Sequence, residues 1–463
     1  MGFLRGENKL LLRRCAFMNI FIWRMLNKWC LFGTHNQAMF NKYPLLNIEA
    51  PLMCNKCLMM SVVDLEMFNN SAMGELVEIS GSDPILGSWT HKAFIPIPLS
   101  GEEPPLSAQT YREVAAAGRE LASLDATARQ LPQPYLLRLP SLRVEAQATS
   151  ALEGTYAPLD AVLTANEAAP TSVEMREVLN YVTMAETGYA WVEEGRPITL
   201  GLLEDLQGAL MRGTPLEEES GHLREGQVVI GRRDLPDPHD PAIKGSRFVP
   251  PPPGDRLRAG VESLLAWIER DHSGKIDPVI EAGMAHYQFE TLHPFRDGNG
   301  RLGRYLIVLT LLRNHLLSEP TLTVSPWFEA RRGEYYDRLL AVSTEGDWDS
   351  FLSFFARGLA HSARSTRKLM LALADVQGRL KETVSASKLR SAKALELVDF
   401  AVAHPSFTAK MVQRAVGLSY SRTNNLIGQF VDLRILQVRE GEGNQRVFWA
   451  PEVLRVLLTG RNR

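Results

Sequence analysis

The chain has 463 residues and a formal net charge of −2, and 22% of its residues are charged. A charge this close to zero excludes a molecule-wide electrostatic attraction to nucleic acid or to an anionic membrane surface. The length suffices for roughly two to four domains with buried cores. Because cysteine is scarce and the sequence offers no clear membrane span, we expect a cytoplasmic globular protein that makes no contact with membranes.

The first 66 residues form an extension whose composition differs from that of the remaining chain. It contains all four cysteines: Cys15, Cys30, Cys54 and Cys57. The last two have the spacing of half a zinc site or a redox pair, but a second pair of ligands at the required spacing is missing. The apolar stretch over residues 15–32 is interrupted by two basic residues and makes a poor membrane span, and a targeting segment would need a clear cleavage site. We interpret residues 1–66 as an extension without a function of its own.

Residues 67–195 are expected to form a helical N-terminal region. A lead-in strand is predicted at residues 93–99. Apolar residues at helical spacing then predict three helices, over residues 107–128, 159–167 and 173–194. The same spacing dominates residues 196–373, which we expect to form a helical core domain. The predicted fold class is therefore mainly α.

A short β-prone segment interrupts this helical core. Val228, Val229 and Ile230 precede Gly231 and favour an extended conformation. The open edge of such a strand could pair with a peptide of a target protein through main-chain hydrogen bonds, which specify little about the target sequence. The alternative is an ordinary surface hairpin. Residues 232–245 are rich in Asp, Pro and Gly, which is typical of a mobile loop.

The most informative segment spans residues 293–304 and reads His-Pro-Phe-Arg-Asp-Gly-Asn-Gly-Arg-Leu-Gly-Arg. Asp297 offers a hard oxygen ligand of the kind that Mg²⁺ combines with substrate phosphates. Gly298 and Gly300 flank Asn299, so the backbone can adopt positive φ angles and turn successive N–H groups toward an anion. If a helix starts here, its unpaired N–H groups strengthen this phosphate site.

A strongly apolar run over residues 302–317 predicts that a buried helix does follow. Arg301 and Arg304 stand three residues apart on one face of its start. Cations at this end of a helix oppose its dipole by about 0.3–1 kcal/mol, so their placement indicates an anionic ligand rather than a contribution to stability. His293 opens the segment, where a neutral imidazole could take a proton from an attacking hydroxyl. Phe295 is expected to anchor the loop in the core.

Residues 298–303 also match the dinucleotide-binding pattern Gly-x-Gly-x-x-Gly, and Glu319 follows at about the required distance. That pattern requires a strand immediately before the glycines. Residues 276–292 instead carry apolar side chains at helical spacing. We therefore reject a dinucleotide-binding domain.

Residues 385–463 are predicted to form a separate domain that begins with a Ser-, Ala- and Lys-rich linker. Helices are expected over residues 395–403, 408–416 and 419–433, and strands over residues 435–439 and 446–449. This order resembles a winged helix-turn-helix domain.

The charge of this domain gives a mild case for DNA as its partner. From Ser385 onward, twelve Lys and Arg residues stand against six acidic ones, and the helix at residues 419–433 begins with polar side chains suited to base edges or phosphates. Glu440 and Glu442, however, make the tip of the wing acidic. Winged helices also bind proteins and form dimers, so both kinds of partner stay open.

Eight positions of residues 293–304 agree with the signature His-x-Phe-x-[Asp/Glu]-Gly-Asn-Gly-Arg-x-x-Arg, so the chain resembles the Fic family. The resemblance implies transfer of AMP from ATP to a Ser, Thr or Tyr hydroxyl of a target protein, which can be the chain itself. It further implies that His293 deprotonates this hydroxyl, that Asp297 holds Mg²⁺ and that the protein forms a homodimer. Nucleotide binding is implied for six residues: Gly298, Asn299, Gly300, Arg301, Arg304 and Tyr336.

Two further segments extend the resemblance. Residues 221–224 and 227–231, followed by residues 247–253, are similar to the family's β-hairpin flap, which binds the target, and to the proline run after it. Residues 149–154 fit the inhibitory pattern [Ser/Thr]-x-x-x-Glu-[Gly/Asn]. In relatives with this pattern the glutamate, here Glu153, pairs with the second motif arginine, here Arg304, and prevents productive binding of the γ-phosphate. A carboxylate–guanidinium pair in a shielded site is a strong competitor for that arginine.

Two functions from different classes stay open. The first is an AMP transferase held inactive by Glu153, whose site could also remove AMP from a modified protein. The second is a nucleotide-sensing, DNA-binding regulator with little transferase activity. The presence of both His293 and Asp297 favours the enzyme.

Overall fold

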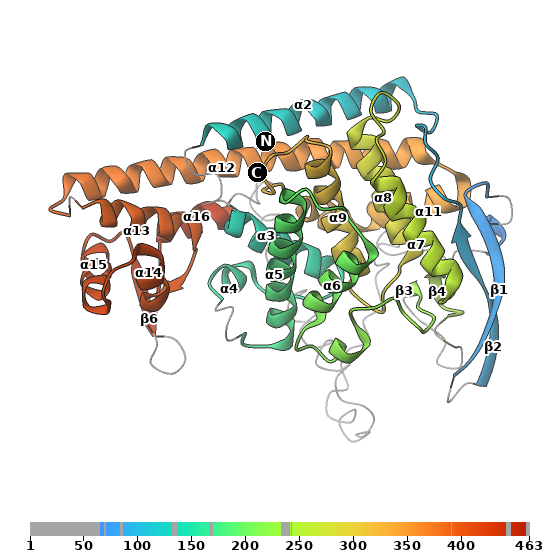
Figure 1. Ribbon diagram of the computed structural model, residues 1–463, viewed down its shortest axis with the longest axis horizontal. Coiled ribbons are helices and arrows are strands. Elements are labelled where there is room, and N and C mark those ends of the chain that lie inside the picture. The colour runs from blue at the N-terminus through green and yellow to red at the C-terminus, as the bar shows by residue number, and fades with distance from the viewer. Residues whose placement is uncertain are drawn as a thin grey trace, which may run out of the picture. The chain divides into compact units, whose positions relative to one another are not determined.

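The computed structural model describes residues 65–68, 71–83, 87–131, 138–165, 170–232, 241, 243–389, 391–440 and 446–459 (Figure 1). The chain divides into one unit of residues 1–59 and a second of residues 60–463. The four cysteines, with the proposed zinc or redox pair, lie outside the described residues, as does most of the predicted mobile loop.

The second unit contains an antiparallel hairpin near its start, although the sequence predicted one strand at residues 93–99. β1 (Gly74–Asp83) pairs along its whole length with β2 (Gly87–Pro96). Ala93 packs with Ile243 and Val249 in a small core to which both strands contribute apolar side chains. The N-terminal region is therefore not purely helical. The sequence Glu-Leu-Val-Glu-Ile in β1 repeats every three residues and so conceals the alternation that marks a strand.

Three helices of the N-terminal region lie where apolar spacing predicted them: α2 (Ala108–Gln130), α4 (Leu159–Leu163) and α5 (Val173–Glu193). The hydroxyls of Ser107 and Ser172 cap α2 and α5 by accepting hydrogen bonds from backbone N–H groups in the first turn. Such caps typically stabilise a helix by about 1 kcal/mol. α4 is shorter than predicted.

A fourth helix, α3 (Arg138–Leu152), was not predicted from apolar spacing. Every residue from Pro140 to Leu152 is buried, so the helix has no polar face. Its charged side chains have buried partners: Arg143 donates to two backbone carbonyls of α4 at 2.9 and 3.0 Å, and Glu145 accepts from the N–H of Ser325 at 3.0 Å. These interior charges interrupt the apolar periodicity from which a helix is normally recognised.

The core domain is helical, as predicted. Its helices are α6 (Leu200–Met211), α7 (Asp255–Ile268), α8 (Pro278–Leu292), α9 (Asn299–Arg313), α10 (Ser325–Glu329) and α11 (Arg332–Glu345). α9 is buried from Asn299 to Leu312 and packs against α8, α5 and α3. This places the start of α9 beside the end of α3, which belongs to the N-terminal region.

The predicted β-prone segment lies at the start of a small hairpin. β3 (Ile230–Arg232) pairs with β4 (Ser246–Phe248), with Ile230 opposite Phe248. Val228 and Val229 precede the strand instead of belonging to it, and Val229 packs against the small core beneath β1 and β2. In the described part of the chain, β3 and β4 form a sheet of two strands, so each has an edge without a partner strand.

α12 (Trp348–Ala386) is a single helix of 39 residues that runs alongside α2 (Figure 1). It crosses the predicted end of the core domain at residue 373 and reaches into the predicted linker. Val376, Leu380 and Val384 are buried at intervals of four residues, so one face of the helix continues to pack beyond that point.

The remaining elements follow the predicted order. They are α13 (Ala392–Ala403), β5 (Phe407–Thr408), α14 (Ala409–Val416), α15 (Tyr420–Asp432), β6 (Gln437–Glu440), β7 (Arg446–Trp449) and α16 (Pro451–Thr459). The three strands pair in the order β5-β7-β6. The assignment of this region to the winged-helix class stays a prediction.

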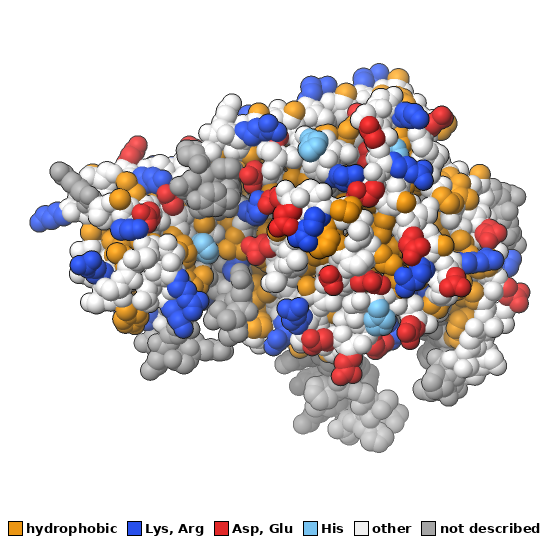
Figure 2. Space-filling model, viewed as in Figure 1, with side chains coloured by type: hydrophobic (Ala, Val, Ile, Leu, Met, Phe, Trp, Pro, Cys, Tyr) orange, Lys and Arg blue, Asp and Glu red, His pale blue; other side chains and the backbone are white. Residues whose placement is uncertain are grey.

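Charges of both signs lie interspersed over the helical elements on the face shown in Figure 2. This agrees with the small net charge of −2. Within the described residues, none of the helices combines the length and apolar character that a membrane crossing requires.

Candidate functional site

The loop between α8 and α9 carries the motif of residues 293–304. His293 ends α8 in a left-handed conformation with φ 47°, and Gly298 starts α9 with φ 83°. The side chain of Asn299 accepts from the N–H of Phe295 and donates to its carbonyl, both at 2.8 Å. Phe295 is fully buried, as the sequence predicted. The loop is therefore fixed by one amide and one ring, which holds the motif side chains in place.

The glycines and Asn299 have different roles in this loop. Only Gly298 uses the positive φ angle that the sequence suggested for both glycines. Gly300 lies inside α9, and a Cβ added there would approach the Glu153 carboxylate to 2.0 Å. Gly300 is thus required for space. Because both polar ends of the Asn299 side chain hold Phe295, only its backbone N–H remains suited to phosphate.

Arg304 and Glu153 form a close ion pair at the end of α3. Arg304 is 1% exposed, and its Nη2 lies 2.6 Å from Glu153 Oε1. Arg304 Nε also donates to the Thr149 hydroxyl at 2.8 Å, and Nη2 contacts the Thr149 carbonyl at 3.2 Å. Burial alone would raise the pKa of Glu153, but the charge and hydrogen bond of Arg304 outweigh it and hold the pKa below its usual value. The first and fifth residues of the sequence pattern thus bind the same arginine.

Arg301, one turn earlier on the same helix, lies between two other carboxylates. Its Nη1 is 3.2 Å from Glu177 Oε2, and its Nη2 is 3.3 Å from Asp297 Oδ1. Asp297 Oδ1 also accepts from the N–H of Gly298 at 2.5 Å. The side chain of Asp297 is 42% exposed, so this carboxylate can reach solvent and ligands.

His293 is held in one tautomer. Its Nδ1 lies 3.2 Å from the carbonyl oxygen of Glu290, which can only accept, so Nδ1 carries the proton and Nε2 retains a lone pair. Burial lowers the pKa of His293 to about 4, with Glu153 opposing this shift and Arg224 supporting it. Arg224 also donates from Nε to the His293 carbonyl at 2.9 Å. The imidazole is therefore neutral at physiological pH and presents Nε2 as a proton acceptor.

Glu290, on the last turn of α8, has a raised pKa, whereas the pKa of His293 is lowered. Burial raises the pKa of Glu290 to about 8, with Arg304 opposing and Glu153 adding to the shift. Its buried Oε1 has no hydrogen-bond partner among the described residues. The carboxyl group is thus expected to be protonated in the folded protein at neutral pH.

Replacing Glu290 by Gln is expected to change how stability depends on pH. The folded-state pKa of about 8 exceeds the usual value of 4.5, so the stabilising contribution is complete below pH 4.5 and is lost as pH rises toward 8. The wild type therefore loses stability between pH 5 and pH 8, whereas Glu290→Gln does not. The melting temperature of the variant minus that of wild type should rise over this range. Thermal melts at both pH values measure this difference, with Glu262→Gln on the exposed face of α7 as control. An unchanged difference would contradict the assignment.

Two site residues had no signal in the sequence. Gln207 on α6 donates to the Asp297 carbonyl at 3.1 Å, and Glu177 lies 24 residues beyond Glu153, outside any recognisable pattern. Both act through contacts between distant segments, which spacing along the chain does not reveal. Arg224 lies in a segment that the resemblance covers; it is 3% exposed and supports the backbone of His293.

Tyr336 and the flap stay predictions. The Tyr336 hydroxyl lies 3.5 Å from the Leu152 carbonyl at the end of α3, next to Glu153. Burial raises its pKa to about 12. Val228, Val229 and Ile230 are partly buried and Gly231 is exposed. The hairpin that contains Ile230 and Gly231 exists, while its role in target binding is untested.

Among the described residues, no cluster of three or more His, Cys, Asp or Glu side chains could hold a metal ion by itself. A single carboxylate that shares Mg²⁺ with substrate phosphates requires no such cluster. The exposed Asp297 carboxylate at the start of α9 fits this second arrangement.

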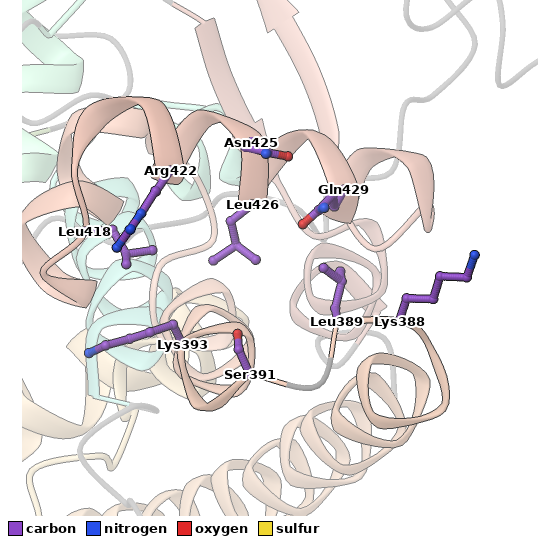
Figure 3. Close-up of a pocket in the computed structure, with 9 residues that line it drawn as sticks. All are labelled: Lys388, Leu389, Ser391, Lys393, Leu418, Arg422, Asn425, Leu426 and Gln429. Carbon is purple, nitrogen blue, oxygen red and sulfur yellow. The ribbon is translucent and has the colours of Figure 1, made fainter.

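A cavity of about 500 Å³ lies elsewhere, between the start of α13 and α15 (Figure 3). Leu426 and Ser391 point toward one another across it, whereas Lys388 points away. Its lining comprises Lys388, Leu389, Ser391, Lys393, Leu418, Arg422, Asn425, Leu426 and Gln429. No residue of the motif contributes to it.

The part of the chain that carries this site is similar to known proteins. Residues 197–311 match the Fic/DOC family and residues 111–190 match the Fic/DOC family N-terminal region. Protein adenylyltransferase Fic of Drosophila virilis is 33% identical over 138 residues, which are 30% of this chain and 24% of that protein. The protein of the same name from Drosophila melanogaster is 32% identical over 30% of this chain and 23% of its own length.

The chain thus matches about a quarter of the length of these curated relatives. A Fic family protein from Desulfovibrio desulfuricans G20 has a crystal structure that aligns with 76% of this chain and 98% of its own, with 22% identity and a TM-score of 0.47. The two family matches cover the N-terminal helices and the core helices up to α9. Residues 111–190 and 197–311 are therefore similar to the Fic/DOC family and its N-terminal region.

Proposed function

We propose that the protein is an adenylyltransferase that moves AMP from ATP to a Ser, Thr or Tyr hydroxyl of a target protein, with the chain itself among its targets. The observation that carries this proposal is the convergence of a neutral His293 and two buried arginines at the start of α9. The curated relatives support it through their name, protein adenylyltransferase. A base next to a phosphate site is the arrangement that transfer to a hydroxyl requires.

The reaction follows from the placement of these groups. His293 Nε2 accepts the proton of the target hydroxyl, and the hydroxyl oxygen forms a bond to the α-phosphorus. The bond between the α-phosphorus and the oxygen that bridges to the β-phosphate breaks, and pyrophosphate leaves. Backbone N–H groups at the start of α9 bind phosphate oxygens, and Arg301 and Arg304 balance the charge of the leaving group.

The position of the radioactive label in ATP tests this function. AMP transfer retains the α-phosphate on the target and releases the γ-phosphate, so α-labelled ATP should label protein and γ-labelled ATP should not. Incubation of the purified chain with Mg²⁺, alone and with a cell lysate, gives both readings. Labelling by γ-labelled ATP would indicate phosphate transfer and contradict the proposal.

The resemblance and the exposed carboxylate together support Asp297 as the residue that would hold Mg²⁺. A bound Mg²⁺ would neutralise charge on the phosphates. In Asp297→Asn, the Mg²⁺ concentration for half-maximal ATP binding is expected to rise by about 10- to 100-fold. Titration of ATP binding with Mg²⁺ measures this directly. Asp205→Asn, an exposed change on α6, should leave it unaltered, and an unaltered Asp297→Asn would contradict the role.

We propose further that Glu153 inhibits transfer by occupying Arg304. The 2.6 Å contact and the lowered pKa of Glu153 support a stable, ionised pair. An arginine in such a pair is not free for a γ-phosphate. Glu153 is also a candidate base for the reverse reaction, the removal of AMP from a modified protein. Its carboxylate lies near enough to the reaction centre to affect the pKa of His293.

A second candidate function involves the C-terminal domain. The residues that line the cavity between α13 and α15 include Lys393 and Arg422 and no acidic residue, which favours an anionic partner. A nucleotide-sensing regulator that binds DNA through α15 would have this property. Titration of duplex DNA with the protein at two salt concentrations distinguishes the candidates, since phosphate contacts weaken steeply with salt. The homodimer stays a prediction from the resemblance.

A further inference from the structure

Arg301 is buried but incompletely satisfied. It is 1% exposed, and its contacts with Glu177 and Asp297 measure 3.2 and 3.3 Å. Both are longer than the 2.6 Å contact between Arg304 and Glu153. Arg301 Nε is buried and has no hydrogen-bond partner among the described residues. Long ion pairs with the two carboxylates therefore hold the guanidinium group. Its Nε–H remains a donor that a further anion could use.

The carboxylate of Glu177 is connected to the turn that carries Glu153. The Thr155 hydroxyl donates to the same oxygen, Glu177 Oε2, at 3.0 Å. Thr155 is itself fixed, because its N–H donates to the Ser150 carbonyl at 2.9 Å and closes the end of α3. Glu177 lies on α5 and is 19% exposed. One short turn thus positions one carboxylate on Arg304 and supports another on Arg301.

The charge balance at this site opposes a triphosphate. Glu153, Glu177 and Asp297 contact the two arginines, so three carboxylates face two guanidinium groups. The protonated Glu290 adds no charge at neutral pH. An ATP molecule that carries several negative charges must compete with these carboxylates for both arginines. Removal of Glu153 alone leaves Arg301 between two carboxylates.

We infer that Glu177 is a second inhibitory carboxylate, which occupies Arg301 as Glu153 occupies Arg304. The Thr155 hydroxyl couples the two contacts, because it connects Glu177 to the turn that carries Glu153. The inference rests on the proposed function for the identity of the anion, the triphosphate of ATP. Full activation then requires that both carboxylates leave their arginines. Movement of the turn after α3 withdraws Glu153 and at the same time removes the hydrogen bond that holds Glu177.

The test measures nucleotide binding in the Glu153→Gly background, where the first carboxylate is absent. Glu177→Gln keeps the size of the side chain and an acceptor for Thr155 but removes the charge. We expect it to bind α,β-methylene-ATP about 3- to 10-fold more tightly than Glu153→Gly alone, by isothermal titration with Mg²⁺. Thr155→Val should tighten binding by a smaller factor. Glu174→Gln, an exposed change on the same helix, is the matched control and should have no effect.

The direction of the change decides the role of Glu177. Weaker or unchanged binding in Glu177→Gln would overturn the inference, because a residue that only orients Arg301 would lose affinity on replacement. If Glu177→Gln does not fold, Glu177→Asp shortens the side chain by one methylene, and the same tightening is expected from it. The analogue cannot transfer AMP, so the readout is independent of catalysis. Tighter binding without any protein labelling from ATP would contradict the proposed function and support the second carboxylate.

Discussion

Replacement of Glu153 by glycine is expected to increase protein labelling from α-labelled ATP by about 10- to 100-fold. The change removes a buried, charge-assisted contact of the kind that contributes about 1.5–3 kcal/mol, and each 1.36 kcal/mol corresponds to a factor of ten. Arg304 keeps its hydrogen bonds to Thr149 at 2.8 and 3.2 Å, so it should stay in place and become available to phosphate. Initial rates of label incorporation at saturating Mg²⁺ provide the measurement.

The control for this variant preserves shape and removes charge. Glu153→Gln fills the same space, so an intermediate increase would show that charge, and not only bulk, blocks the site. Because a Cβ at position 300 would lie 2.0 Å from Glu153 Oε1, the carboxylate also occupies space next to the phosphate site. Equal labelling by wild type and Glu153→Gly, with equal affinity for ATP, would rule out inhibition by Glu153.

Loss of His293 is expected to have the second large effect. In the Glu153→Gly background, His293→Ala should reduce the rate of AMP transfer by about 10²- to 10⁴-fold, because the target hydroxyl loses its proton acceptor. The affinity for ATP should change little, since the proposed phosphate contacts come from α9. His91→Ala on β2, whose side chain is remote from the motif, is the control. A drop in ATP affinity that accounts for the lost rate would contradict the role of a base.

The pH dependence of transfer gives an independent reading of His293. Its pKa of about 4 means that the imidazole is neutral, and able to accept a proton, at all pH values well above 4. The rate should therefore stay constant from pH 8 down to about pH 5 and fall as pH drops through the pKa of the imidazole. If the rate instead fell at a pH near the usual pKa of histidine, the site would be open to solvent when Glu153 is removed.

The sequence predicted the centre of the site better than its surroundings. α8, α9 and the loop between them were predicted because residues 276–317 combine helical apolar spacing with a glycine-rich interruption. Arg304 and Glu153 were paired through the resemblance, and their side chains do meet. Glu177 was missed because its position depends on the packing of α5 against α9, which no local pattern encodes.

Elements outside the site were missed for other physical reasons. α3 is surrounded by protein, so it lacks the polar face that reveals most helices. Among the described strands, β1 pairs with β2 alone, and its described side chains are at most partly buried, so its sequence lacks a clear apolar alternation. The predicted end of the core domain at residue 373 lies within α12. In α12 the buried positions continue at the same spacing, and the helix continues with them.

The burial of α3 on all sides ties the segment that precedes Glu153, the proposed inhibitory residue, to the core of the protein. A truncated chain that lacks residues 138–153 would lose Glu153 together with the helix that packs between α5 and α10, and we expect its core to misfold. Under the proposed inhibition by Glu153, relief is expected at the turn after the helix, where Gly154 adopts φ 91° and the chain leaves the core. Excision of the whole segment is expected to damage the core, whereas a local displacement of this turn leaves the helix in place.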